Sequence, residues 1–74
     1  MKTNKSDTYK NLADNIKTLR KKKSMTQEKL AEALGVTTGA VYKWESAQSV
    51  PEITMMMELA EIFEVSVDAL LGFE

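Results

Sequence analysis

The segment from Thr26 to Glu45, TQEKLAEALGVTTGAVYKWE, constrains the fold most strongly, because it has the pattern of two short helices joined by a tight turn. Thr26 suits the N-cap of the first helix, since its hydroxyl can accept a hydrogen bond from an unpaired N–H. Small and apolar side chains then recur at helical spacing on one face: Leu30, Ala31 and Leu34. The first helix is therefore expected over about residues 26–34, with Ala31 small enough for a close crossing.

The turn and the second helix follow directly. Gly35 comes after the last apolar residue, where the chain must reverse, and glycine adopts the required positive φ without a steric penalty. Thr37 can cap a second helix, which we expect over about residues 37–45. Val41 and Trp44 point back toward the core at a spacing of three. The outward side of this helix carries Thr38, Gly39, Tyr42 and Lys43.

These residues resemble the lambda-repressor-like (Xre/Cro-type) helix-turn-helix DNA-binding family. The likeness extends from about Tyr9 to Gly72 and includes the segments IKTLRKKK, MTQEKLAEALGV, WES and ITMMMELAEIFEVSVDALLG. The resemblance implies an all-α domain of five helices, with the helix-turn-helix at helices two and three. The second helix of this motif lies in the major groove of double-stranded DNA.

The rest of the chain is assigned more coarsely. Residues 1–7 are expected to form a flexible basic tail, and residues 8–74 the DNA-binding domain. A first helix is expected from Thr8 to Lys22, with an apolar stripe of Tyr9, Leu12, Ile16 and Leu19. After the motif, Pro51 indicates the first turn of a fourth helix, which we expect to end near Phe63. Ser66 can cap a fifth helix, which Gly72 ends.

Composition narrows the function classes. The 74 residues suit one small domain and include no cysteine and no histidine. We therefore expect no metal site, no cofactor and no enzyme activity, because no nucleophile–base pair or phosphate loop is present either. No apolar run approaches the roughly 20 residues of a membrane span. We expect a cytoplasmic protein, and the resemblance implies a bacterial or phage origin.

The net charge of −1 conceals an uneven distribution. Residues 1–23 hold eight basic and two acidic side chains, whereas residues 51–74 hold six acidic side chains and no basic one. Such a dipolar chain would orient its basic end toward DNA phosphates. The alternative is that both charge runs are ordinary solvated faces.

The expected fourth helix has more apolar residues than one core face requires. These are Ile53, Met55, Met56, Met57, Leu59, Ala60, Ile62 and Phe63. Either this helix is central and buried nearly all round, or its methionines form a subunit interface together with Phe73. The resemblance favours a homodimer.

The resemblance implies four base-contacting positions on the second motif helix: Thr38, Gly39, Tyr42 and Lys43. Lys43 can donate to guanine O6 and N7 or hold a phosphate, and Thr38 can contact a base edge or a thymine methyl. Gly39 departs from the long polar residue usual in the family. Either the backbone approaches DNA closely there, or recognition of that base pair is weaker.

Phosphate contacts are expected from small polar side chains at the rim: Gln27, Thr37, Ser46 and Gln48. Gln27 begins the first motif helix, whose N-terminus also favours an anion. The alternative for Gln27 is an ordinary solvated residue in the first turn of a helix. The alternative for Ser46 and Gln48 is a plain loop without a binding role. Arg20 and Glu45 match a structural ion pair of the family, so neither is expected to contact a base.

One departure from the family lies after Glu45, where Ser46-Ala47 replaces an Asn-Gly or Ser-Gly pair. Either Ala47 adopts a strained left-handed conformation, or the loop takes a different path. The predicted function is a sequence-specific transcriptional regulator, a repressor by resemblance, that binds a palindromic operator as a dimer. The alternatives are a protein-interaction module, such as an antitoxin or adaptor domain, and the N-terminal domain of a longer regulator.

Overall fold

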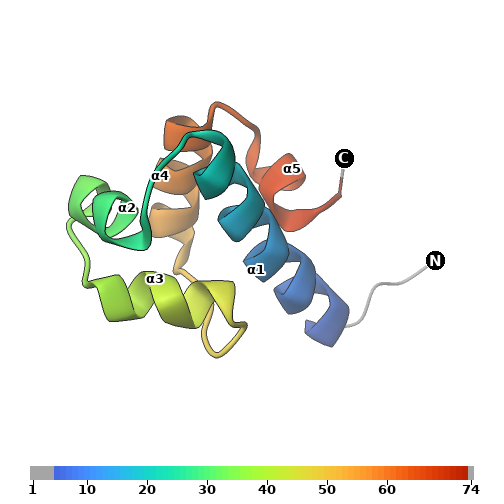
Figure 1. Ribbon diagram of the computed structural model, residues 1–74. Coiled ribbons are helices and arrows are strands. Elements are labelled where there is room, and N and C mark those ends of the chain that lie inside the picture. The colour runs from blue at the N-terminus through green and yellow to red at the C-terminus, as the bar shows by residue number, and fades with distance from the viewer. Residues whose placement is uncertain (1–4, 74) are drawn as a thin grey trace.

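The computed structural model describes residues 5–73, which form five helices and no strand (Figure 1). The helices are α1 (Lys5–Lys22), α2 (Gln27–Leu34), α3 (Thr38–Glu45), α4 (Ile53–Phe63) and α5 (Val67–Leu71). The all-α, five-helix prediction is confirmed. Within the described residues, none of these helices is both long and apolar enough to span a bilayer.

The long helix α1 supports three of the other four helices. It contacts α3, α4 and α5, while α2 packs between α3 and α4 (Figure 1). Every helix contributes apolar side chains to one core, whose largest members include Leu12, Ile16, Leu30, Val41, Trp44, Leu59, Phe63 and Leu70. One shared core therefore fixes the position of α3 relative to α1 and α2.

Side-chain caps begin three of the helices. The hydroxyls of Thr26, Thr37 and Ser66 each accept a backbone N–H three residues later, at 3.0, 3.1 and 3.0 Å. Each cap satisfies one of the N–H groups that a helix start leaves unpaired. The three caps predicted from sequence are confirmed.

The helices end in two different ways. Glycine follows α2 and α5, where Gly35 and Gly72 have φ of 72° and 86°. Residues with a Cβ take the left-handed conformation at three other places: Ser24 at 57°, Ala47 at 62° and Glu64 at 59°. A Cβ in this region costs roughly 1–2 kcal/mol, so these three positions are strained.

Two predicted helix starts were wrong. Helix α1 begins at Lys5 rather than Thr8, and Asp7 lies in its first turn, where an acidic side chain favours a helix N-terminus. Residues 5–7 are thus helical, and the remainder of the predicted tail, residues 1–4, lies outside the described residues. Pro51 precedes α4 instead of lying in its first turn: its side chain is buried, and Glu52, with an extended backbone, is the N-cap residue.

The apolar stripes were only partly right. Tyr9 is 41% exposed, so the buried face of α1 begins at Leu12. Helix α4 is not buried all round, since Ile53 and Met57 are 62% and 58% exposed. Of its methionines only Met57 is exposed, whereas Met55 and Met56 pack against the core. Of the methionine surface predicted for α4, the part that is exposed is therefore Met57.

Candidate nucleic-acid interface

The crossing of α2 and α3 is built from the small and apolar residues that the sequence places there. Leu30, Ala31 and Val41 are at most 2% exposed, and Trp44 is 6% exposed. Because Val41 and Trp44 are held in the core, the rotation of α3 about its axis is fixed. The opposite side of α3 must then face solvent.

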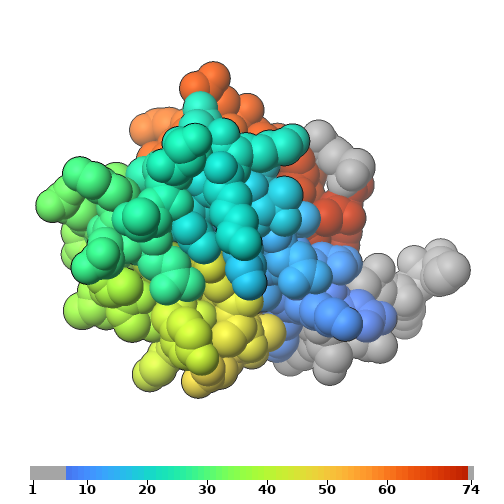
Figure 2. Space-filling view, in the orientation of Figure 1, coloured from blue at the N-terminus to red at the C-terminus, as the bar shows by residue number. Residues whose placement is uncertain are grey.

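That outward face holds all four residues predicted to contact bases. Thr38, Gly39, Tyr42 and Lys43 are exposed, and Tyr42 retains 55% of its accessible surface. In the space-filling view, α3 and the loop after it form a continuous edge of the molecule beside α2 and α1 (Figure 2). The fold therefore leaves this face open to a partner.

Gly39 is not required by the fold. A Cβ built there would meet only the Thr37 hydroxyl oxygen, at 3.8 Å, which is ordinary van der Waals contact. A glycine inside a helix costs about 0.5–1 kcal/mol relative to alanine. Packing within the domain thus gives no reason for glycine at this position.

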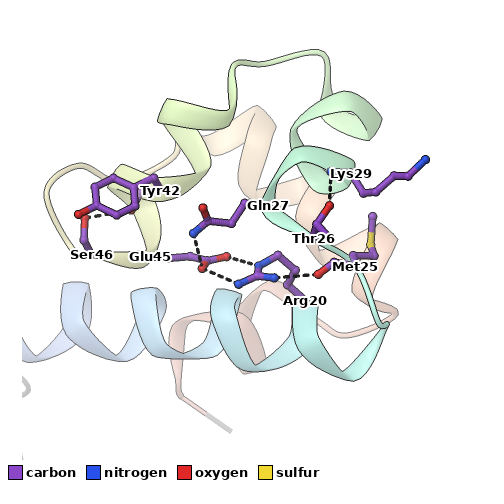
Figure 3. Close-up of polar contacts among 8 residues, drawn as sticks. All are labelled: Arg20, Met25, Thr26, Gln27, Lys29, Tyr42, Glu45 and Ser46. Atoms are coloured by element: carbon purple, nitrogen blue, oxygen red, sulfur yellow. Dashed lines mark hydrogen bonds and ion pairs between the residues drawn. The ribbon is translucent and has the colours of Figure 1, made fainter.

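A polar network under the C-terminal end of α3 ties three helices together (Figure 3). Arg20 of α1 donates from Nε to Glu45 Oε2 at 2.6 Å and from Nη2 to Oε1 at 3.0 Å. Its third nitrogen, Nη1, donates to the Met25 carbonyl at 2.7 Å, just before α2 begins. The structure thus forms the bidentate pair that the resemblance implies.

Burial distinguishes this ion pair from a surface pair. The side chains of Arg20 and Glu45 are 10% and 4% exposed. The hydrogen bond that Arg20 donates to Glu45 raises the pKa of Arg20 above its ordinary value, against the opposing effect of burial. A bidentate, shielded pair of this kind combines charge with a fixed geometry. It holds the end of α3 against α1.

Gln27 joins the same network, which the sequence analysis missed. Its Nε2 donates to Glu45 Oε1 at 3.0 Å, so it is not a freely solvated glutamine (Figure 3). The two residues are 18 positions apart and lie on different helices, so no local periodicity reveals the contact. Only the crossing of α2 and α3 brings them together.

The other predicted phosphate contacts also have partners within the protein. The Thr37 hydroxyl caps α3, and the Ser46 hydroxyl donates to the Tyr42 carbonyl at 2.9 Å. Gln48 donates to Ser46 Oγ at 2.8 Å. The left-handed Ala47 between them resolves the alternative left open by the sequence in favour of a strained loop. These bonds give the rim next to α3 a defined shape.

The similarity of the chain to known proteins identifies its family. The family described as helix-turn-helix matches residues 16–70. The chain belongs to this family. It is a DNA-binding fold family and not a family of enzymes.

Several helix-turn-helix regulators resemble the chain in sequence. The HTH-type transcriptional activator BcrR of Enterococcus faecalis is 38% identical over 61 residues, which is 82% of this chain and 30% of that protein. The cryptic phage CTXphi transcriptional repressor RstR of Vibrio cholerae is 30% identical over 53 residues, or 72% of this chain and 47% of RstR. The chain thus spans less than half the length of either relative.

A solved structure supports the fold. The crystal structure of the P22 c2 repressor protein in complex with synthetic operator 9T superposes with a TM-score of 0.79 at 27% sequence identity. The match covers 85% of this chain and 96% of the repressor chain. The helix-turn-helix domain is therefore lambda-repressor-like, as predicted.

Proposed function

We propose that this chain is the sequence-specific DNA-binding domain of a transcriptional regulator, acting in the cytoplasm and inserting α3 into the major groove. The observation that carries the proposal is the outward face of α3, which is exposed although the helix itself is rigidly held. The P22 c2 repressor, which shares the fold, is described in complex with an operator, and the relatives are named transcriptional regulators. By resemblance the regulation is repression, through occupation of an operator.

The base-reading set is Thr38, Gly39, Tyr42 and Lys43. Lys43 donates to guanine O6 and N7, while Thr38 and Tyr42 offer a hydroxyl, a methyl or a ring to base edges and thymine methyls. The lack of a side chain at Gly39 makes discrimination weaker at the base pair that it faces. Because only one of these side chains is charged, hydrogen bonds and shape carry much of the specificity.

Phosphates are contacted from the rim around this face, by Gln27, Thr37, Ser46 and Gln48. Both α2 and α3 begin with unpaired N–H groups and the positive end of a helix dipole, which favour an anion. The eight basic side chains of residues 1–23 add long-range attraction. Such contacts set orientation and register more than sequence preference.

The domain binds as a homodimer to a palindrome whose half-sites are about 34 Å apart, one turn of the double helix. Exposed apolar side chains suited to such contact are Met57 and Phe73, which are 58% and 60% exposed. Sedimentation at tens of micromolar tests the association. A monomer under those conditions, both free and on DNA, would contradict it.

A protein-interaction module, such as an antitoxin or adaptor domain, is the second candidate. The observation that favours it is the outer side of α4, where Thr54, Met57, Glu58 and Glu61 line a shallow hollow. With no basic residue after position 50, this acidic surface repels DNA and suits a protein partner. The two candidates differ in which helix makes the contact.

Selection of bound sequences from a random duplex pool tests the proposed function. We expect enrichment of a palindrome with half-sites one turn apart. Lys43→Ala and Thr38→Ala should each weaken binding to the enriched duplex about 5- to 150-fold and relax its sequence preference, because one good base contact contributes about 1–3 kcal/mol of discrimination.

Lys29→Ala is the matched control, since it removes the same charge from α2. Figure 3 shows its side chain extending away from Tyr42 and Ser46. This control variant should bind all duplexes slightly more weakly, and its preferred sequence should be unchanged. A pool without any enriched sequence, bound only weakly and with a steep salt dependence, would favour the interaction module.

A further inference from the structure

Glu45 determines which way the side-chain amide of Gln27 faces, and this has a consequence for phosphate binding. We propose that Arg20 and Glu45 are positioning residues for DNA, which orient Gln27 so that its amide donates to a backbone phosphate. The inference rests on the proposed function and deepens it. It assigns a binding role to a pair that would otherwise only stabilise the fold.

The first step concerns the Glu45 carboxylate. Its Oε1 accepts hydrogen bonds from both Arg20 Nη2 and Gln27 Nε2, each at 3.0 Å, and its Oε2 accepts from Arg20 Nε. An ionised carboxylate can only accept, so the neighbouring amide must present its nitrogen. The flipped amide would bring two acceptor oxygens to about this distance and lose the bond. The orientation of the Gln27 amide is thus dictated by Glu45.

The second step concerns the hydrogens that remain. An amide nitrogen carries two N–H groups, and Glu45 accepts one of them. Gln27 is half-buried and is the first residue of α2, next to the unpaired backbone N–H groups of the helix start. Its second N–H therefore adds a donor to a helix end that already favours anions. A phosphate oxygen, which only accepts, complements that arrangement.

The third step concerns Arg20, which fixes both partners of this contact. Two of its nitrogens hold Glu45 at the end of α3, and the third holds the Met25 carbonyl ahead of α2 (Figure 3). Its charge also compensates the carboxylate, which would otherwise repel a phosphate bound nearby. One guanidinium thus fixes the relative positions of Glu45 and the start of α2.

A double-mutant cycle on the enriched duplex tests the proposal. Gln27→Met keeps the length of the side chain and removes its hydrogen bonds, so we expect affinity to fall about tenfold, equally for enriched and random duplexes, with an unchanged salt dependence. Glu45→Gln replaces the obligate acceptor by an amide that can donate or accept, and should cause a similar loss. Once Gln27→Met is present, Glu45→Gln should cause no further loss of affinity.

Additive losses in the cycle would overturn the proposal, because Glu45 would then act independently of Gln27. A Gln27→Met protein that binds like the wild type would also overturn it. If Lys43→Ala still abolishes sequence preference in that case, the proposed function survives and only the positioning role fails. Absence of DNA binding by the wild-type chain would contradict both.

A second measurement avoids the risk that Glu45→Gln destabilises the domain. The two Nε2 protons of Gln27 give separate NMR signals in the wild-type protein. Addition of the enriched duplex should shift one of them strongly downfield and leave the other, bonded to Glu45, nearly unchanged. Equal small shifts of both, or none, would contradict a phosphate contact.

Discussion

The C-terminal end of α1 and the residue that follows it make two ion pairs that differ in almost every property. Arg20 contacts Glu45 at the end of α3 through two hydrogen bonds, with side chains 10% and 4% exposed. Lys23 contacts Glu64 at the end of α4 through a single bond of 2.9 Å, with side chains 38% and 78% exposed. One helix end thus forms a buried junction with α3 and an open one with α4.

This difference shows where the fold requires precision. An exposed lysine pair is screened by water and salt, and it contributes little to stability. A shielded bidentate arginine pair is costly to break, because the remaining charge is left without a partner. The shielded arginine pair lies under α3, the helix that we propose reads DNA. The exposed lysine pair lies at the end of α4.

Arg20→Met should have the largest effect. It leaves the shielded Glu45 carboxylate without a charged partner, with only the Gln27 amide donating to it, so we expect the free energy of unfolding to fall by about 3 kcal/mol. The matched control is Lys23→Met, which should leave the melting temperature nearly unchanged. Urea denaturation of both variants measures the contrast. Equal losses in the two variants would show that burial does not distinguish the pairs.

Thr37→Ala tests the other end of α3. Removing the hydroxyl that accepts the Ala40 N–H should lower the free energy of unfolding by about 1 kcal/mol, the usual value of an N-cap. The effect should therefore lie between those of Arg20→Met and Lys23→Met. A loss as large as that of Arg20→Met would mean that the cap, and not the ion pair, is the main anchor of α3.

Ala47→Gly tests the strain in the loop after α3. Glycine relieves the strain of the left-handed conformation, which costs about 1–2 kcal/mol for a residue with a Cβ. Glycine also gives the unfolded chain more conformational freedom, which lowers the stability of the folded state. We expect a net stabilisation of about 0.5–1 kcal/mol and a higher melting temperature. An unchanged or lower melting temperature would contradict the strained loop.

The same substitution at the other junction, Glu64→Gly, also removes a carboxylate that pairs with Lys23. If this exposed pair contributes as little as we argue, Glu64→Gly should still raise the melting temperature. A clear decrease would show that the open junction is stronger than its exposure suggests.

The smallest expected effect depends on pH. The hydrogen bond and charge of Lys23 hold the pKa of Glu64 below its ordinary value of 4.5. A lowered pKa in the folded state means that the pair stabilises the protein above pH 4.5 and loses this effect as the pH falls through the folded pKa. The small difference between wild type and Lys23→Met should therefore shrink in acid. A difference that grows in acid would contradict this assignment.

Local patterns were sufficient to predict the motif. Thr26, Gly35 and Thr37 each act within a few residues along the chain, so caps and turn could be derived from spacing alone. The same holds for Val41 and Trp44, whose spacing identified the buried side of α3. These interactions are short-range, and the sequence therefore carries them directly.

Long-range contacts could not be predicted from such local patterns. Pro51 is of a residue type that suits the first turn of a helix, but its side chain is fully buried and α4 begins at Ile53, after the N-cap residue Glu52. Tyr9 fits the spacing of the α1 stripe but lies beyond the edge of the core. For Gln27, the residue type and its place at a helix start suggested a phosphate contact, whereas its bond to Glu45 depends on how two helices cross.

The most direct test of the proposed role of α3 is NMR mapping of the DNA-binding face. The labelled protein would be titrated with the enriched duplex, or with a random duplex if none is enriched. We predict that the largest amide shifts lie at residues 37–43 and at Gln27, with little change on the exposed side of α4. Large shifts at Ile53, Met57 and Glu61, with α3 unaffected, would contradict the claim that the firmly anchored helix α3 is the one that contacts DNA.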